Sequence, residues 1–481
     1  MSFRLLHLVV GLLTLSVAEC VSTHRRAATG CNQYAGQLNQ SISAASTIEC
    51  GGQNVRWSEY AAPQPGVVVK IGAEDDVSKV VAFASKRNIP FLVQGGGNGW
   101  ANTFTLDGSG IVIDMSKLKE ITFNSNKTEV TFQAGVTNAD LVAAAWNSNV
   151  RASTATCNCV SILGATLGGG LSRTQGPYGM EVDQLLSVNY VDGDGRKKTV
   201  TAKSDPDLWW ALKGAGANFG IVTSAVFKSY LVPQEENLAW TGALIYDPSK
   251  IEALMSAIDD LTFEAEMQLD FYFVANPPAY EPTVVMLPFY LGSEEAGREK
   301  FSSLLAVGPL ADSTAVLTYD AWNAASDAFC SKGGRKPSYA VGLTTVDPAA
   351  WRNVWDEYSS FLKQHPEAGT TTILTECYAT SKALEIGSSE SSYPFRDVKC
   401  HAVAIPWYED ASLDGEANAF GQKVRDYLAP TAGTSGLQAY INFAHGDEPL
   451  EAIYGSSLPR LQRLKKKYDP KKRFNQWFPL S

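Results

Sequence analysis

Three glycine-rich clusters in the first half of the chain constrain its fold more than any other feature of the sequence. They lie at residues 95–99, 164–170 and 214–220. Glycine permits positive φ angles and a close approach of the backbone to a ligand, and successive backbone N–H groups in such turns form a concavity that binds anions. A tight turn between strands explains any one cluster equally well, but the three together favour a site for a phosphate-containing ligand.

The sequence around the first cluster alternates between strand and helix. The apolar run 67–71 predicts a buried strand, Asp75 and Asp76 predict a helix start, and residues 91–93 predict a strand leading into Gly95. We expect further strands at 111–114, 130–133, 185–191, 198–201 and 221–227, and helices at 138–146 and from Asp205.

Two common nucleotide-binding motifs do not fit these clusters. Gly214-x-Gly216 resembles part of a dinucleotide-binding fingerprint, but that motif requires a preceding strand and a following helix. Here the helix carrying Trp209 and Trp210 precedes the glycines and a strand follows. No cluster is followed by the Gly-Lys-Ser/Thr of a P-loop.

The character of the sequence changes near Pro233. From residue 238 to 427 glycine clusters are few and aromatic residues are many, and an amphipathic helix is expected at 349–364. We expect strands here at 268–274, 283–289, 370–374 and 402–407. This composition predicts an α+β cap that encloses a small apolar substrate. The last 50 residues predict a strand at 439–443 and a helix at 458–468 that ends in lysines.

The ordered motifs resemble one family of flavoproteins. The motifs are Val93-Gln94-Gly95-Gly96-Gly97, Cys157-x-x-Val160, Leu167-Gly168-Gly169-Gly170, residues 214–222, Tyr440-Ile441-Asn442-Phe443 and the tail from Tyr454 to Phe474. They are similar to those of the berberine-bridge-enzyme-like branch of the vanillyl-alcohol-oxidase/PCMH family, and most of all to secreted fungal members. The resemblance implies an α+β fold. A PCMH-type two-lobed FAD-binding domain would span residues 59–233 and be completed by 430–481, with a substrate cap at 238–427.

The resemblance also implies a cofactor, FAD, and a set of residues that bind it. Hydride would pass from a small organic substrate to the flavin, with O2 as acceptor. The Gly95 turn would wrap the pyrophosphate, and Ile221 and Val222 would lie near the adenine. The full cofactor-binding set would be Gly95, Gly96, Gly97, Asn98, Gly99, Cys157, Val160, Ser161, Gly164, Gly168, Gly169, Gly170, Gly220, Ile221 and Val222.

The chain departs from the family pattern at Asn98. Many members have a histidine there, bonded to the flavin 8α carbon, and an amide cannot form that bond. Cys157 matches the family's other attachment, a cysteine at flavin C6, although a buried thiol or a disulfide partner also explains it. The resemblance places Tyr440 and Asn442 over the flavin as catalytic residues. His401 and His445 are the other titratable candidates.

Two alternatives remain open at this point. The first is an FAD-containing cyclase or isomerase without net oxidation, which the missing histidyl bond favours because that bond is thought to raise the flavin's oxidising power. The second is a non-catalytic, secreted flavin-binding protein.

The ends and the charge of the chain bear on its location and partners. Residues 1–18 are typical of a signal peptide, with Arg4 before an apolar run that is shorter than the roughly 20 residues needed to span a bilayer. We therefore expect a secreted protein without a membrane span. The dibasic pair Arg25-Arg26 offers a second site at which the exported chain could be trimmed further.

Secretion makes disulfides and glycosylation possible. Cys31 and Cys50 are predicted to pair, while the pairing of the later cysteines stays open. Sequons occur at Asn39 and Asn126.

The charged residues and histidines predict neither a nucleic-acid partner nor a metal site. The net charge of −10 argues against binding to nucleic acid. The basic cluster at 465–473 is interpreted as a solvated helix end. His365, His401 and His445 do not have the spacing of metal ligands.

Overall fold

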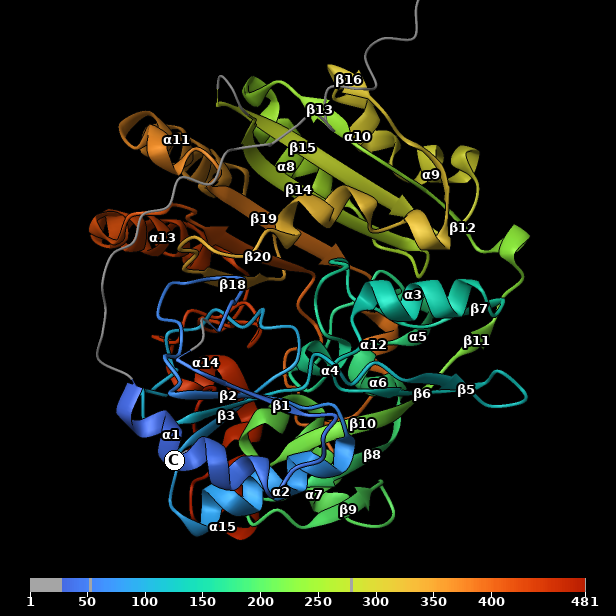
Figure 1. The fold of residues 1–481 in the computed structure, drawn as a ribbon. Helices are drawn as coiled ribbons and strands as arrows, with labels where there is room; N and C mark the ends of the chain where they lie inside the picture. Colours follow the sequence, from blue (N-terminus) through green and yellow to red (C-terminus); the bar gives the residue numbers. More distant parts are fainter. Residues whose placement is uncertain (1–27, 52–53, 277–279, 481) are drawn as a thin grey trace, which may run out of the picture.

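The computed structural model describes the chain over residues 28–51, 54–276 and 280–480. It forms two halves, and the lower half in Figure 1 combines both ends of the chain while the upper half comes from the middle. The two halves have separate hydrophobic cores. The predicted signal peptide 1–18, the dibasic Arg25-Arg26 and the side chain of Cys31 lie outside what the structure describes.

The lower half contains two main sheets. In the first, three parallel strands are joined by one antiparallel strand, and the second is wholly antiparallel. The first has the order β1 (Thr47–Cys50), β2 (Val67–Lys70), β4 (Ile111–Asp114), β3 (Phe91–Gln94); the second has the order β5 (Ile121–Phe123), β6 (Glu129–Gln133), β10 (Ile221–Lys228), β8 (Leu185–Val191), β9 (Lys197–Val200). The short strands β7 (Val150–Arg151) and β11 (Tyr230–Leu231) form a separate pair.

The helices that the sequence predicts in the lower half lie close to the predicted residues. Three acidic residues open α2 (Glu74–Lys86), whose apolar side chains are buried, and Thr137 and Asp140 form a capping box on α3 (Asn138–Trp146). The other helices are α1 (Ala28–Asn39), α4 (Ile162–Thr166), α5 (Gln175–Tyr178), α6 (Glu181–Gln184), α7 (Pro206–Ala215), α14 (Leu450–Tyr454) and α15 (Leu458–Tyr468). As predicted, the third glycine cluster follows a helix, α7, and precedes a strand, β10.

A nine-stranded sheet forms the centre of the upper half (Figure 1). Its main path is β16 (Ala311–Asp312), β13 (Leu244–Tyr246), β15 (Glu281–Tyr290), β14 (Met267–Asn276), β19 (Thr372–Tyr378), β20 (Cys400–Ile405) and β18 (Tyr339–Leu343). In addition, β12 (Leu238–Thr241) pairs with β15, and β17 (Ala315–Thr318) pairs with β12. Its helices are α8 (Ile251–Asp260), α9 (Glu294–Lys300), α10 (Ser302–Ala306), α11 (Pro348–Gln364) and α13 (Asp414–Leu428), while α12 (Ser381–Leu384) packs against α5 of the lower half.

The two faces of this sheet belong to different cores. Successive side chains on a strand point to opposite faces, and on β14 the residues Leu269, Phe271 and Phe273 pack with α8 and α11 in the upper core. On β19, Ile373 and Cys377 do the same, whereas Leu374 and Tyr378 pack in the core of the lower half. The lower face of the sheet is therefore a ceiling over the lower half.

The strand predicted at residues 439–443 is wrong. The backbone there is irregular through Tyr440 and then turns, with the N–H groups of Phe443 and Ala444 both donating to the carbonyl of Tyr440. A strand requires a neighbouring ladder, and this segment instead closes hydrogen bonds within its own turn. Its apolar side chains are still buried, which explains why the sequence resembles a strand.

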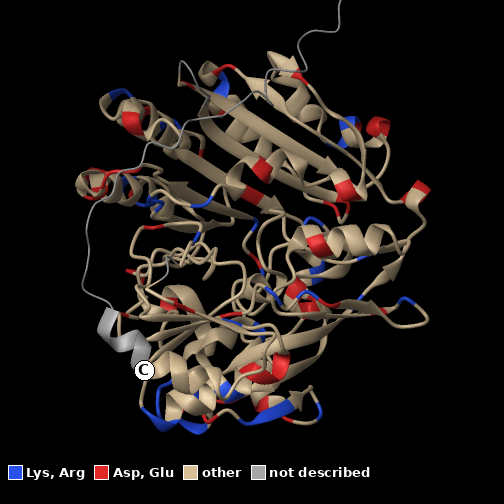
Figure 2. Cartoon of the chain, in the orientation of Figure 1, with Lys and Arg blue, Asp and Glu red and all other residues tan. Residues whose placement is uncertain are grey.

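The basic cluster near the C-terminus is only partly a solvated helix end. Lys and Arg gather around α15 and β9 at the lower end of the molecule (Figure 2), where Lys467 and Lys471 are exposed and pair with acidic residues. Lys465 differs, because it is buried and donates to Asp469 and to the carbonyls of Asn218 and Phe474. One lysine of the run therefore fastens the C-terminal segment to the third glycine cluster.

Over the described ranges, no helix has the length and apolar character needed to cross a membrane.

Candidate active site

A cavity of about 360 Å³ lies between the glycine loops and the lower face of the nine-stranded sheet, here called the cap sheet. Its walls are mostly apolar, with a few polar groups from both halves. Fourteen of the residues that the sequence assigns to the site line it: Gly95, Gly96, Gly97, Asn98, Gly99, Cys157, Val160, Ser161, Gly164, Gly220, Ile221, Val222, Tyr440 and Asn442. Three of the predicted residues, Gly168, Gly169 and Gly170, do not line it.

The first glycine run forms a turn that other backbone segments crowd closely. It follows β3 directly, and Gly97 has a φ of +76°, which favours glycine. A Cβ on Gly96 would lie 2.6 Å from Asn98 Oδ1 and 3.0 Å from the backbone nitrogen of Ser161. The turn therefore requires glycine in order to pack closely against residues 159–161. With no side chains in the way, the backbone of residues 95–97 faces the cavity.

Arg56 fastens this turn at both ends. Its Nη1 donates to Gln94 Oε1 at 2.6 Å and its Nη2 donates to the Gly99 carbonyl at 2.8 Å. The side chain is buried, burial lowers its pKa to about 10, and within the described ranges no carboxylate forms an ion pair with it. A buried cation without a counter-charge is costly, so this site suits an anionic ligand. The sequence motifs gave no sign of Arg56.

Two other observations indicate that the cavity is shaped for a ligand. Asn98 Oδ1 and Arg56 Nε are buried without a hydrogen-bond partner among the described residues, and each such group costs about 1–3 kcal/mol. Both residues line the same cavity as the glycine turn. A guanidinium without a carboxylate partner beside the glycine turn fits a diphosphate, and the apolar remainder of the cavity fits the ring systems of a dinucleotide.

The Leu167-Gly168-Gly169-Gly170 motif supports the site from below. A Cβ on Gly168 would lie 2.4 Å from Asn442 Oδ1, and one on Gly169 would lie 2.9 Å from the Tyr393 ring. The Gly170 N–H donates to the Tyr440 hydroxyl at 3.1 Å. These glycines therefore position the 440–442 turn, and their contact with the cavity is indirect.

Tyr440 lies at the cavity wall, but its environment is unsuited to a base. Burial raises the pKa of its hydroxyl well above the ordinary value, whereas a base would need a lowered pKa. The hydroxyl oxygen accepts from Asn442 Nδ2 at 2.7 Å and from Gly170. Both bonds use the oxygen as acceptor, which leaves the O–H proton available to a ligand. Asn442 also donates to the Ala165 carbonyl.

The two histidines named from the sequence are uncharged at neutral pH. Burial lowers the pKa of His401 to about 3, and it also lowers the pKa of His445. His401 lies near Tyr440, with their ring centroids 5.5 Å apart, whereas His445 stacks on Tyr339. Neither residue lines the cavity.

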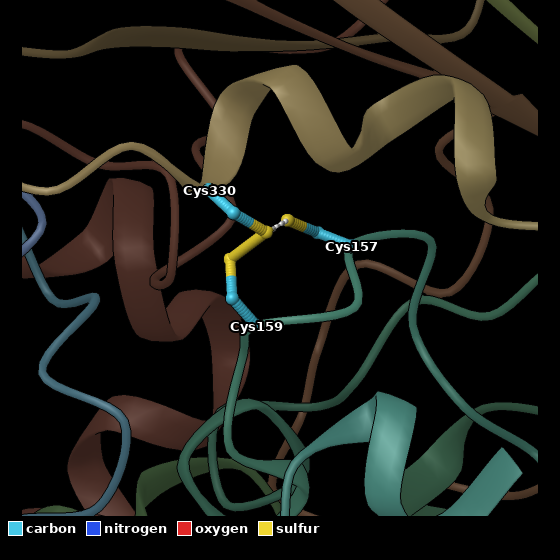
Figure 3. Close-up of side chains that lie close together, drawn as sticks. All are labelled: Cys157, Cys159 and Cys330. Carbon is cyan, nitrogen blue, oxygen red and sulfur yellow. Dashed lines mark hydrogen bonds between the residues drawn. A yellow bond between two sulfur atoms is a disulfide. The ribbon is translucent and has the colours of Figure 1, made fainter. Parts of the chain in front are cut away.

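Three cysteines lie close together (Figure 3), and one of them, Cys157, lines the cavity. Cys159 forms a disulfide with Cys330, which joins a loop of the lower half to the 3-10 turn η5 (Ala324–Cys330) of the upper half. Cys157 is a free thiol whose Sγ lies 3.5 Å from Cys159 Sγ and 3.7 Å from Cys330 Sγ. Burial raises the pKa of Cys157 to about 11. Two of the three sulfurs are bonded to each other, so the cluster does not offer three thiolates to a metal.

The sequence analysis missed an ionisable group on the ceiling of the cavity, Glu376 of β19. Thr156 Oγ1 donates to its Oε1 at 2.8 Å and the Tyr378 hydroxyl donates to its Oε2 at 2.9 Å. Burial, and then the charge of Asp270, raise its pKa to about 7. A signal was present, because Glu376 is the one charged residue in an otherwise uncharged strand.

The fold and this cavity define a two-lobed protein with a site suited to a dinucleotide cofactor. The chain has a TM-score of 0.80 to BBE-like 1 of Physcomitrella patens, at 20% identity and covering 92% of this chain and 99% of that one. It has a TM-score of 0.79 to a xylooligosaccharide oxidase of Myceliophthora thermophila, at 18% identity and covering 94% and 99%. At these identities the likeness shows the fold alone.

Sequence relationships identify the family. Residues 65–201 match the FAD binding domain family, and residues 439–477 match the family described as berberine and berberine like. The chain is 33% identical to the FAD-linked oxidoreductase OXR1 of Pyricularia oryzae, covering 86% of this chain and 84% of that protein. It is also 33% identical to the FAD-linked oxidoreductase hasG of Aspergillus fumigatus, covering 86% and 91%. The chain belongs to the berberine-bridge-enzyme-like FAD-linked oxidoreductases, and FAD is its cofactor.

Proposed function

We propose that this protein oxidises a small, largely apolar organic substrate in the cavity, with Glu376 as the proton acceptor and O2 as the final oxidant. The observation that carries the proposal is a buried carboxyl group, Glu376, on the cavity wall opposite the glycine loops, where burial raises its pKa to about 7. A general base is most effective when its pKa lies near the operating pH. FAD, when bound, supplies the hydride acceptor.

The residues present fit the cofactor. Arg56 and the backbone of residues 95–97 would hold the diphosphate, and Ile221 and Val222 would contact the adenine end. Ser161 and Gly164 line the same wall, and we assign them to the remaining part of FAD. On this proposal residues 59–233 and 430–481 form the FAD-binding domain, and residues 238–427 form the substrate cap.

Glu376 would remove the proton that a substrate O–H or N–H loses as its hydride leaves. Thr156 and Tyr378 donate to its two oxygens, which holds the carboxylate in one orientation. Tyr440 would donate its free hydroxyl proton to the substrate or cofactor. One hydride and one proton leave the substrate together, and their transfer to O2 forms one H2O2.

The walls of the cavity indicate the substrate class. Tyr272, Phe329 and Phe443 contribute aromatic side chains, and Leu374 and Ile405 contribute aliphatic ones. Such walls suit an aromatic or terpenoid skeleton, as found in secondary metabolites, better than a sugar, which requires many hydrogen-bonding groups.

We also propose that the protein is secreted. The signal-like residues 1–18 support this, as do the disulfides Cys159–Cys330 and Cys377–Cys400, because disulfides persist in oxidising compartments. The sequon residues Asn39 and Asn126 are exposed, as glycosylation requires.

Aerobic turnover tests the proposed function. We expect the purified protein to absorb at about 450 nm, to lose this band when an aromatic alcohol or terpenoid substrate is added without air, and to regain it with O2 while releasing one H2O2 per product. An oxygen electrode and a peroxidase-coupled assay measure this. Conversion of a substrate without O2 uptake would contradict net oxidation and favour a cyclase or isomerase, which the absence of a histidine at position 98 first suggested.

A second prediction concerns the attachment of the flavin. Asn98 cannot bond to FAD, and the Cys157 thiol is protonated at neutral pH and lies against the Cys159–Cys330 disulfide. We therefore expect acid precipitation to release the yellow colour into the supernatant. Colour that stays in the pellet of the wild type and leaves the pellet of Cys157→Ser would show instead that Cys157 holds the flavin covalently.

A further inference from the structure

A row of three titratable side chains crosses the lower face of the nine-stranded sheet, and the middle one, Glu376, lines the cavity. In the register of the cap sheet, Glu376 on β19 is directly opposite Asp270 on β14 and His401 on β20. Directly opposite residues in antiparallel strands share a face and have Cβ atoms about 4.5–5.5 Å apart. The two carboxyl groups are therefore neighbours, and both are buried.

Arg173 reaches this row from the lower half. Its Nη1 lies 3.3 Å from Asp270 Oδ2 and donates to Gln268 Oε1 at 2.7 Å, and its Nε donates to Asn323 Oδ1 at 3.0 Å. Gln268 Nε2 in turn donates to Asp270. The Arg173 and Asp270 side chains are 4% and 0% exposed, so solvent screens neither charge. The guanidinium is thus held against Asp270 by two neutral side chains.

The charges in this group balance with only one carboxylate. The charges of Arg173 and one ionised carboxyl group sum to zero, whereas two ionised carboxyl groups would leave a net negative charge among buried side chains. Like charges in such a site resist joint ionisation, and their titrations are coupled. Burial raises the pKa of Asp270 as well, but Arg173 contacts Asp270 directly. This contact favours the ionised form at Asp270 over Glu376 and leaves the shared proton on Glu376.

The other groups that face Glu376 do not change this balance. His401 is neutral, because burial lowers its pKa to about 3. Burial raises the pKa values of Tyr272 and Tyr378 well above the ordinary value, and that of Cys157 to about 11. All four groups are therefore uncharged near neutral pH, and Asp270 and Arg173 remain as the charged neighbours.

We propose that Asp270 and Arg173 are positioning residues that set the proton occupancy of Glu376, with the Asp270 charge holding the proton on Glu376 and the Arg173 charge opposing it. This inference rests on the proposed role of Glu376 as base, and it adds two residues that the cavity lining does not include. Without Asp270, the guanidinium would act on Glu376 alone. Without Arg173, the two carboxyl groups would face each other without a cation between them.

The test is a pH titration of the carboxyl bands in infrared difference spectra of the FAD-loaded protein, which needs no substrate. The band that is absent from Glu376→Gln identifies Glu376. We expect Asp270→Asn to lower the midpoint of that band by about one to three pH units, and Arg173→Gln to raise it, since a nearby charge shifts a pKa by that amount. Opposite shifts from the two substitutions are not a result that a purely structural role would give.

Folding of each variant is checked by its 450 nm band and its thermal midpoint. If neither variant folds, the titration of the Glu376 band in the wild type still tests the inference. The inference requires the midpoint of that band to lie near neutral pH. A midpoint at the ordinary value for glutamate overturns it. Unchanged midpoints in folded variants overturn it too. Failure of the proposed function is a separate outcome, in which Glu376→Gln oxidises substrate as fast as the wild type.

Discussion

Replacement of Glu376 by glutamine is expected to slow reduction of the bound flavin by substrate by about 10²- to 10⁴-fold, the usual contribution of a positioned general base. Glutamine has nearly the same shape, and its oxygen can still accept from Thr156 or Tyr378. It cannot accept a proton. The change therefore removes the chemistry and leaves the cavity largely intact, and stopped-flow measurement of bleaching at about 450 nm reports the rate.

The pH dependence of the same rate gives a second readout. Only the ionised form of Glu376 accepts a proton, and its pKa is raised to about 7. The rate of flavin reduction should therefore rise as the pH increases through 7 and then level off. In Glu376→Gln this limb should be absent. Glu367→Gln is the matched control, because the Glu367 side chain is 59% exposed and does not line the cavity; it should behave as the wild type. A pH limb that persists in Glu376→Gln would assign the proton to another group.

The sequence predicts the cofactor-binding half better than the ceiling of the site for a physical reason. The glycine turn needs a positive φ at Gly97 and close packing at Gly96, and both require glycine in any fold. The local sequence is therefore enough to predict this turn. Glu376 is different. Both faces of β19 are buried, in two different cores, so the strand has no alternation of polar and apolar residues. The side that faces the cavity is defined only when the two halves come together.

The errors near the site have the same origin. Tyr440 and Asn442 are predicted at the cavity and line it, but the strand predicted around them is a turn because no neighbouring strand is present to pair with it. Cys159 pairs with Cys330 across 171 residues, and the spacing of cysteines in the sequence carries no information about a contact between the two halves. Arg56 was missed because it lies outside the glycine motifs, and only the folded chain brings it to the Gln94 side chain and the Gly99 carbonyl.

Replacement of Gly96 by alanine tests the glycine turn itself. The new methyl group would lie 2.6 Å from Asn98 Oδ1, 3.0 Å from the Ser161 nitrogen and 3.3 Å from the Cys159 carbonyl. Two of these contacts are with backbone atoms, so the turn must move away from the 159–161 segment. Such overpacking costs about 1–3 kcal/mol, which corresponds to FAD binding weakened by roughly 5- to 150-fold.

The flavin content of the purified variant, from absorbance at about 450 nm relative to the protein band, and the retention of FAD during ultrafiltration measure this loss. Gly108→Ala is the control, because it lies in the same half of the protein and a Cβ there would meet nothing within 4 Å. We expect it to keep its flavin and its thermal midpoint. Because the Gly96 methyl group disturbs only the contact between two loops, its variant should stay folded while it loses FAD. A Gly96→Ala protein with full flavin content would show that the cofactor does not depend on the close packing of this turn, and the assignment of the diphosphate to residues 95–97 and Arg56 would then be wrong.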